Sequence, residues 1–133
     1  MRITDDTVAS GRCLCRAVTF EARGRPLWIV HCHCESCRRQ TGSPATTFAG
    51  YRASQVSFAT SVRRIFESSP GVQRSFCARC GSPISYEAAR SPGEIHLYAA
   101  LFDRSEDFVP ERHVNYGERL PWLHLDEHLP HRP

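Results

Sequence analysis

The stretch Cys77-Ala-Arg-Cys80-Gly81 places two cysteines three positions apart and follows them with a glycine. This spacing is typical of a zinc knuckle, in which loop amides hydrogen-bond the thiolates and the glycine adopts a positive φ. A second close pair, Cys13-Leu-Cys15, lies near the amino terminus. In a strand, residues two positions apart point to the same side, so a strand here would present both sulfurs together. We therefore expect these four thiols to bind one structural zinc ion and to tie residue 13 to residue 80.

The remaining three cysteines lie together in Cys32-His-Cys34-Glu-Ser-Cys37. Three thiolates leave one position open on a tetrahedral metal, and an open position is where a bound metal acts on a substrate. We interpret Cys32, Cys34 and Cys37 as the catalytic zinc site, so the chain would bind two zinc ions. A substrate thiol would enter as thiolate and become a nucleophile at neutral pH. A fourth protein ligand is the alternative, and the candidates are His96, His113, His124 and His128.

Disulfide bonding is the main alternative to metal binding. Seven cysteines cannot all pair within one chain, and C-x-C neighbours meet the geometry of a disulfide poorly. Residues 1–6 are polar and contain no apolar core of a signal peptide. These observations favour metal ligation in a reducing compartment, and we expect a cytoplasmic protein.

The length of 133 residues suits one domain with a modest core, and no apolar run approaches the length of a membrane span. Nine prolines and eight glycines favour many turns and few long helices. A short helix is predicted at residues 35–42, with Gly42 as its stop. Short strands are predicted at residues 17–23, 27–32, 46–51, 55–58, 63–67, 72–76, 84–87 and 94–101. We therefore predict a mainly β domain of short strands and short helical turns over residues 11–133, after a lead-in segment at residues 1–10.

The formal charge is +3, and all 17 basic residues are arginine. Two zinc ions held by seven thiolates would bring this charge close to zero. A nearly neutral domain without a long basic run is a poor match for the phosphate backbone of nucleic acid. A nucleic-acid binder of the zinc-ribbon type would need a contiguous arginine surface with exposed aromatic side chains, and we rank that hypothesis last.

Longer motifs surround the cysteines and carry a family resemblance. They are Gly11-Arg-Cys13-Leu-Cys15, Cys32-His-Cys34-Glu-Ser-Cys37-Arg38-Arg-Gln-Thr-Gly42-Ser-Pro, Arg74-Ser-Phe-Cys77-Ala-Arg-Cys80-Gly81-Ser-Pro-Ile, Phe108-Val-Pro-Glu-Arg-His-Val and Leu120-Pro-Trp-Leu. Over roughly residues 11–130 the sequence resembles the glutathione-dependent formaldehyde-activating enzyme (GFA) family, which includes the centromere protein V-like proteins. One departure is Arg16, where the family commonly has glycine.

The resemblance implies a zinc-stabilised β-tent fold and a carbon–sulfur lyase activity. That activity joins glutathione to formaldehyde and gives S-hydroxymethylglutathione. The implied structural zinc ligands are Cys13, Cys15, Cys77 and Cys80, and the implied ligands of the second zinc are Cys32, Cys34 and Cys37. The expected partners are a glutathione-like thiol and a small aldehyde, without a membrane.

Arg38 directly follows the middle cysteines, and its guanidinium could pair with a carboxylate of such a thiol. We expect Arg38, Thr41 and Gly42 to bind the substrate, with backbone amides of this segment also available to an anion. Ordinary surface ion pairing is the alternative for Arg38. No general acid or base can be identified from the sequence.

A zinc-stabilised binding module without catalysis is the second hypothesis. Such a module would complete the middle site with a fourth protein ligand and would have no pocket beside it. An enzyme would instead keep the middle cysteines accessible to a small substrate.

Overall fold

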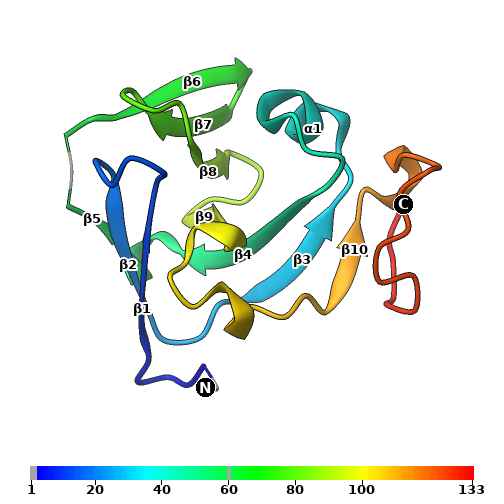
Figure 1. Ribbon diagram of the computed structural model, residues 1–133, viewed down its shortest axis with the longest axis horizontal. Helices are drawn as coiled ribbons and strands as arrows, with labels where there is room; N and C mark the ends of the chain where they lie inside the picture. Colours follow the sequence, from blue (N-terminus) through cyan, green and yellow to red (C-terminus); the bar gives the residue numbers. More distant parts are fainter. Residues whose placement is uncertain (1–2, 60) are drawn as a thin grey trace.

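Two β-sheets and one α-helix make up the computed structural model, which describes residues 3–59 and 61–133 (Figure 1). The smaller sheet has three antiparallel strands in the order β1 (Val8–Arg12), β2 (Thr19–Arg23) and β5 (Val56–Phe58). Short 3₁₀ turns connect several elements. The predicted mainly β class is confirmed.

The larger sheet has seven strands, and its spatial order differs from the chain order. The order is β10 (Arg112–Val114), β3 (Trp28–Cys32), β4 (Thr46–Arg52), β9 (Glu94–Tyr98), β8 (Pro83–Ala88), β7 (Val72–Cys77) and β6 (Arg63–Ser69). The pair β10–β3 is parallel, and the other pairs are antiparallel. Because β9 lies between β4 and β8, strands β7 to β9 belong to the same sheet as β3, which leads into the middle cysteines.

The main hydrophobic core lies between the two sheets. Alternate residues of β3, β4 and β9, such as Ile29, Ala49 and Leu97, point from the larger sheet into this core. Phe20 of β2 meets Phe102 edge-on, with ring centroids 5.2 Å apart. This packing follows from the period of two in a strand, which leaves the opposite face of the larger sheet free to form a second surface.

The opposite face of the larger sheet carries a second apolar cluster. Phe48, Tyr86 and Tyr98 of the sheet pack there with Cys37 of α1 (Glu35–Thr41). Figure 1 shows α1 on the side of β4 away from β1 and β2. The helix therefore covers part of the sheet face that the main core does not use.

The helix α1 ends as the sequence predicts. Gly42 has φ 72°, and its N–H donates to the carbonyl oxygen of Arg38 at 2.7 Å. Glycine adopts this left-handed conformation without the steric cost that a side chain imposes. Thr41 stabilises the same end by donating its hydroxyl to the carbonyl oxygen of Cys37 at 2.8 Å.

Two details of the predicted strands are wrong. Strand β1 ends at Arg12, so Cys13 and Cys15 lie in the following turn rather than in a strand. Arg16 gives that turn its left-handed residue, with φ 72°. The strand predicted at residues 94–101 ends at Tyr98 and continues as a 3₁₀ turn, which redirects the chain into the core.

The predicted lead-in at residues 1–10 overlaps the first strand, since β1 begins at Val8 and pairs with β2. Residues 1 and 2 of that segment lie outside the described residues. At the other end of the chain, the tail returns to β10, where His113 forms a parallel bridge with His131. None of the described helices is long and apolar enough to cross a membrane.

Candidate functional site

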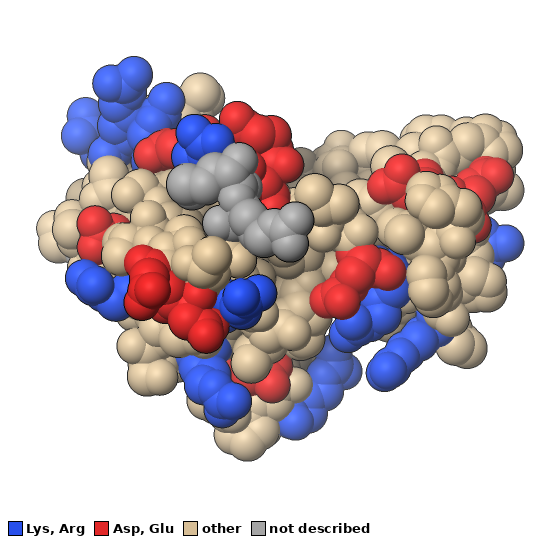
Figure 2. All heavy atoms as spheres, turned by 90° about the horizontal axis from the view of Figure 1, so that it is seen from below, with Lys and Arg blue, Asp and Glu red and all other residues tan. Residues whose placement is uncertain are grey.

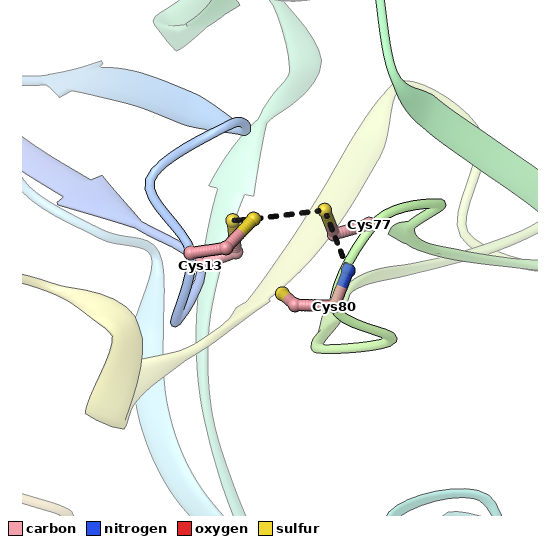
Figure 3. A group of neighbouring side chains, drawn as sticks. Cys13, Cys77 and Cys80 are labelled. Atoms are coloured by element: carbon pink, nitrogen blue, oxygen red, sulfur yellow. Dashed lines mark hydrogen bonds between the residues drawn. The ribbon is translucent and has the colours of Figure 1, made fainter.

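Four cysteines, two in the turn after β1 and two at the end of β7 and in the turn that follows it, meet beside the main core (Figure 3). The sulfur of Cys15 lies 3.7 Å from that of Cys13 and 3.7 Å from that of Cys77. With Cys80 included, the four sulfurs lie within 4.8 Å of one another. A tetrahedral site with zinc–sulfur bonds of about 2.3 Å has sulfur–sulfur edges of about 3.8 Å, so this spacing fits zinc.

Backbone amides point at the sulfurs of this cluster, as a zinc knuckle requires. The N–H of Val18 donates to the Cys13 sulfur at 3.2 Å. The N–H groups of Arg79 and Cys80 donate to the Cys77 sulfur at 3.4 and 3.5 Å. Such donors stabilise thiolates in preference to neutral thiols. The donor set and its surroundings therefore fit a bound metal such as zinc.

Ser82 completes the second turn of the cluster. Its hydroxyl lies 3.1 Å from the Cys80 sulfur and also accepts the N–H of Leu14 at 3.1 Å. The hydrogen bond from Ser82 lowers the pKa of the Cys80 thiol to about 5. A thiol with such a pKa is ionised at neutral pH and is ready to bind a metal.

The other three cysteines line a pocket on the second face of the larger sheet. Cys32 ends β3, Cys34 precedes α1 and Cys37 lies within α1. The pocket has a volume of about 400 Å³. Its other walls are aromatic and polar, and include Trp28, Phe48, Tyr86, Arg90, His96 and Asn115. Cys32 and Cys37 are buried and Cys34 is half-buried, so the thiols lie at the wall of the pocket and not on the outer surface. A pocket of this size suits a small-molecule substrate.

The three thiols of the pocket are arranged less tightly than the first four. Among residues 3–59 and 61–133, the cluster of Cys13, Cys15, Cys77 and Cys80 is the one group of ligand atoms with the mutual spacing of a metal site. A second zinc at the pocket therefore stays a prediction. Its three proposed ligands nonetheless come to one place, because β3 leads directly into α1.

Two side chains from distant parts of the chain donate hydrogen bonds to the pocket sulfurs. Arg74 of β7 donates from Nη1 to the Cys37 sulfur at 3.4 Å. Asn115 donates from Nδ2 to the Cys32 sulfur at 3.3 Å. Both donors favour sulfur that carries negative charge. Neither residue was identified from the sequence, because nothing local to Arg74 or Asn115 indicates a neighbouring cysteine.

Arg74 is held firmly in this position. Its side chain is buried, its Nε donates to the Ser68 hydroxyl at 3.0 Å, and its guanidinium lies 5.0 Å from the centre of the Tyr86 ring. A buried guanidinium needs a negative or strongly polar partner. The Cys37 sulfur is such a partner once it is ionised or bound to a metal.

The three thiols also shift one another's ionisation. Hydrogen bonds from Cys32 and Cys37 lower the pKa of the Cys34 thiol. The same contacts, first with Cys32 and then with Cys34, raise the pKa of the Cys37 thiol. Ionised Cys34 is thus stabilised by its two neighbours, which is how a group of thiols prepares to accept a cation.

His96 shares the pocket with the thiols and is held by its neighbours. Its Nε2 lies 3.1 Å from Oε1 of Glu94. The imidazole meets the Trp28 indole edge-on at 4.5 Å and stacks on the Tyr86 ring at 5.4 Å. Burial lowers the pKa of His96, although Glu94 opposes that shift. The structure thus holds an imidazole that is neutral at pH 7 beside the thiols.

The histidines next to the middle cysteines have other partners. His31 contacts the Thr47 hydroxyl and the Asp126 carboxylate, both at 2.8 Å. His33 contacts His113, with 2.8 Å between Nε2 and Nδ1. These contacts join the cysteine segment to β4, β10 and the tail of the chain.

The expected substrate-binding residues lie along α1, outside the lining of the pocket. Arg38 has a buried Nε without a hydrogen-bond partner among the described residues. Thr41 and Gly42 form the end of the helix. Two other arginines, Arg90 and Arg132, line the pocket, and among the described residues no acidic one does. The role expected for Arg38, Thr41 and Gly42 stays a prediction.

Charged side chains are mixed on the face seen in Figure 2. Arginine and acidic side chains are interspersed there, and no continuous basic band crosses this face. Exposed arginines of the protein also pair with acidic side chains, as in Arg25–Asp5 and Arg39–Glu35. This face therefore lacks the basic footprint that a phosphate backbone requires.

A comparison with protein families tests the family resemblance that the cysteine motifs suggest. The sequence profile described as glutathione-dependent formaldehyde-activating enzyme matches residues 8–118. The chain belongs to the glutathione-dependent formaldehyde-activating enzyme family. The GFA match spans both cysteine groups and most strands of both sheets.

Similar proteins carry related names. An uncharacterized lyase of Schizosaccharomyces pombe is 29% identical over 104 residues, which cover 78% of this chain and 75% of the yeast protein. A Halomonas elongata protein with the provisional name glutathione-dependent formaldehyde-activating enzyme is 28% identical over 126 residues, covering 87% of this chain and 80% of that protein. A crystal structure of a Rhodobacter sphaeroides protein has a TM-score of 0.61 at 22% identity and covers 71% of this chain and 88% of that one. This last similarity supports the fold.

Arg16, in the turn after Cys15, adopts a left-handed conformation with φ 72°. A non-glycine residue in this region carries a steric cost of about 1 kcal/mol. The glycine that the sequence resemblance leads us to expect at this position would avoid that cost.

Proposed function

We propose that this protein is a zinc-dependent carbon–sulfur lyase that joins a glutathione-like thiol to formaldehyde or a similar small aldehyde. One observation carries the proposal: Cys32, Cys34 and Cys37 line a pocket of about 400 Å³, separate from the group of Cys13 and its three partners. A binding module without catalysis would not need a pocket at the middle cysteines. The names of the two relatives support the same reaction class.

The surroundings of the middle cysteines suit a metal. Arg74 and Asn115 aim N–H donors at two of the sulfurs, which compensates the negative charge of a group of three thiolates. Zinc bound by Cys32, Cys34 and Cys37 would supply a positive centre that keeps an incoming thiol ionised at neutral pH. With the structural zinc, we propose two zinc ions per chain. Such thiol chemistry fits a reducing compartment such as the cytoplasm.

The pocket walls suit an anionic thiol. Arg90 is oriented by its hydrogen bond from Nη2 to the Tyr86 hydroxyl, at 3.0 Å. Arg90 and Arg132 bring two positive charges to a pocket that no acidic side chain of the described residues lines. A guanidinium pairs well with a carboxylate, and glutathione carries two. We propose that Arg90 and Arg132 make the pocket prefer thiols that carry carboxylates over neutral thiols. Arg38, which directly follows Cys37 in the sequence, would contribute to the same preference.

The reaction itself is an addition. The thiol sulfur forms a bond to the carbonyl carbon, the carbonyl π electrons move to oxygen, and the proton lost by the thiol ends on that oxygen. Trp28, Phe48 and Tyr86 give the pocket aromatic walls, which would exclude water and hold both reactants close together. Thiols and formaldehyde also combine spontaneously, so the contribution of the protein is to bring them together in the correct orientation.

Exchange spectroscopy by nuclear magnetic resonance tests the proposal. Glutathione and formaldehyde would be mixed at equilibrium, and the rate of exchange between free and hydroxymethylated glutathione measured with and without the protein. We expect the zinc-loaded protein to accelerate this exchange and Cys34→Ser to abolish the acceleration. An unchanged rate with fully zinc-loaded wild-type protein would contradict the proposed function and favour the binding module.

A further inference from the structure

The pocket contains a histidine to which the proposed function gives no role. We propose that His96, oriented by Glu94, is the group that carries the proton from the substrate thiol to the carbonyl oxygen. The inference rests on the proposed function, because it needs a thiol and a carbonyl compound in this pocket. It adds the acid–base residue that could not be identified from the sequence.

The sheet places His96 at the centre of a row that crosses five strands. In this row, Trp28 pairs with Gly50, Gly50 with His96, His96 with Tyr86 and Tyr86 with Arg74. Residues paired in this way present their side chains on the same face of a sheet. The row therefore puts the imidazole between an indole and a phenol, on the face that carries the thiol pocket.

Gly50 makes this placement possible. A Cβ atom at position 50 would lie 2.5 Å from two atoms of the Trp28 ring. Without that atom, the indole lies over β4 and meets His96 edge-on, with centroids 4.5 Å apart. Tyr86 holds the imidazole from the other side, at 5.4 Å and an angle of 22°. The ring is thus fixed in orientation before any substrate enters.

Glu94 determines which nitrogen of His96 faces the substrate. The Nε2–H donates to Glu94 Oε1 at 3.1 Å, which leaves the lone pair on Nδ1. Within the part of the chain that the structure describes, Nδ1 has no hydrogen-bond partner. His96 lines the pocket and its side chain is 14% exposed, so Nδ1 is the nitrogen left to meet a substrate there. A carboxylate that orients a histidine and stabilises its charged form is a common arrangement of acid–base sites.

The groups around His96 keep its lone pair free at neutral pH. Burial lowers the pKa of His96, and the positive charge of Arg90 acts in the same direction. Glu94 raises the pKa and so stabilises the imidazolium once it forms. The other polar groups of the row are the Tyr86 hydroxyl, which accepts a hydrogen bond from Arg90, and the Arg74 guanidinium, which lies 5.0 Å from the centre of the Tyr86 ring. His96 is therefore a base before the reaction and an acid after it has taken one proton.

The proton and electron transfers balance with these residues. The S–H bond of the thiol breaks, its proton passes to Nδ1 of His96, and its electron pair forms the bond from sulfur to the carbonyl carbon. The π electrons of the carbonyl move to oxygen, which takes the proton back from Nδ1. His96 ends neutral, and no oxidant or reductant is consumed. In the lyase direction, the same steps run in reverse.

The variants His96→Gln and Glu94→Gln test the inference, with His124→Gln as a matched control. His124 also pairs with a glutamate, Glu127, but the pair is exposed and lies outside the pocket. Exchange of glutathione with its formaldehyde adduct would be measured across pH 4–9, together with zinc content and calorimetric binding of glutathione. The titration of the His96 imidazole would be followed by nuclear magnetic resonance in the wild-type protein and in Glu94→Gln.

We expect His96→Gln to lose at least about a hundredfold of the acceleration, the usual contribution of acid–base catalysis, and to keep its zinc and its glutathione binding. His124→Gln should behave as wild type. In wild type, the acceleration should fall at low pH with the same midpoint as the imidazole titration. Glu94→Gln removes the charge that raises the pKa of His96, so both midpoints should move to lower pH.

Acceleration by His96→Gln within about twofold of wild type would overturn the role of His96. If that variant does not fold, a pH profile of Glu94→Gln identical to wild type would overturn the role equally. Absence of acceleration by wild-type protein would instead contradict the proposed function itself. The imidazole titration distinguishes these outcomes further, because it reports the ionisation of His96 without depending on turnover.

Discussion

The sulfurs of Cys15 and Cys77 lie 3.7 Å apart, although 62 positions separate the two residues in the chain. This contact joins the turn after β1 to the end of β7, and so links the two sheets. A metal at this point closes a long loop, whereas Cys32, Cys34 and Cys37 lie within six positions of one another. The two cysteine groups should therefore differ in what they contribute to stability.

Cys77→Ser should unfold or aggregate the protein, and Cys34→Ser should not. Structural zinc contributes on the order of 10 kcal/mol of folding free energy in small domains. That value is comparable with the whole stability of a chain of this size, about 5–15 kcal/mol. Circular dichroism and zinc content of both variants measure the difference. Equal loss of structure in both variants would mean that the division into structural and reactive sites is wrong.

Arg74→Met should weaken metal binding at the pocket by about 10–100-fold, because it removes the N–H donor to the Cys37 sulfur. Methionine fills most of the same volume, and the fold should survive. Competition with a chromophoric chelator measures the affinity. Arg64→Met, at an exposed position on the neighbouring strand β6, is the control. Equal affinities in the two variants would remove Arg74 from the site.

Gly50→Ala should lower stability by about 1–3 kcal/mol, since a new methyl group would overlap the Trp28 ring. The change should also displace Trp28 from the pocket wall and weaken glutathione binding. Gly117→Ala is the matched control, because a Cβ there meets nothing within 4 Å. Denaturant unfolding of both variants gives the comparison. A stability of Gly50→Ala equal to that of the control would show that Trp28 moves aside freely.

Arg90→Gln should weaken glutathione binding by up to about fivefold, the range expected for a partly exposed ion pair. Zinc content should not change. Arg38→Ala tests the residue expected from the sequence alone. Calorimetry on both variants ranks the two arginines. A loss confined to Arg38→Ala would place the carboxylate of the substrate at α1 instead of at the pocket wall.

The cysteine spacing predicted which four thiols come together, because two cysteines only two or three positions apart can reach the same metal ion. Periodicity of two likewise located β2 to β9 but not β1 or β10, and Gly42 marked the end of α1. The strand predicted for Cys13 and Cys15 was wrong because Arg16 adopts a left-handed conformation that its residue type does not indicate. Local sequence thus predicted the elements better than the turns between them.

The pocket could not be predicted in the same way. Its key neighbours depend on the register of β7, β8 and β9, which brings Arg74, Tyr86 and His96 into one row. Register is a property of several distant segments, and a shift of one residue would turn each side chain to the other face. Asn115 reaches Cys32 only because β10 adds to β3 in parallel.

X-ray absorption at the zinc edge, with and without glutathione, tests the central claim most directly. Seven cysteines shared by two zinc ions give an average of about 3.5 sulfurs per zinc, and a bound substrate thiol should raise this average to about four. Elemental analysis of the same samples should give two zinc ions per chain. A single zinc with four sulfurs, unchanged by glutathione, would contradict an open thiol-binding metal site in this pocket.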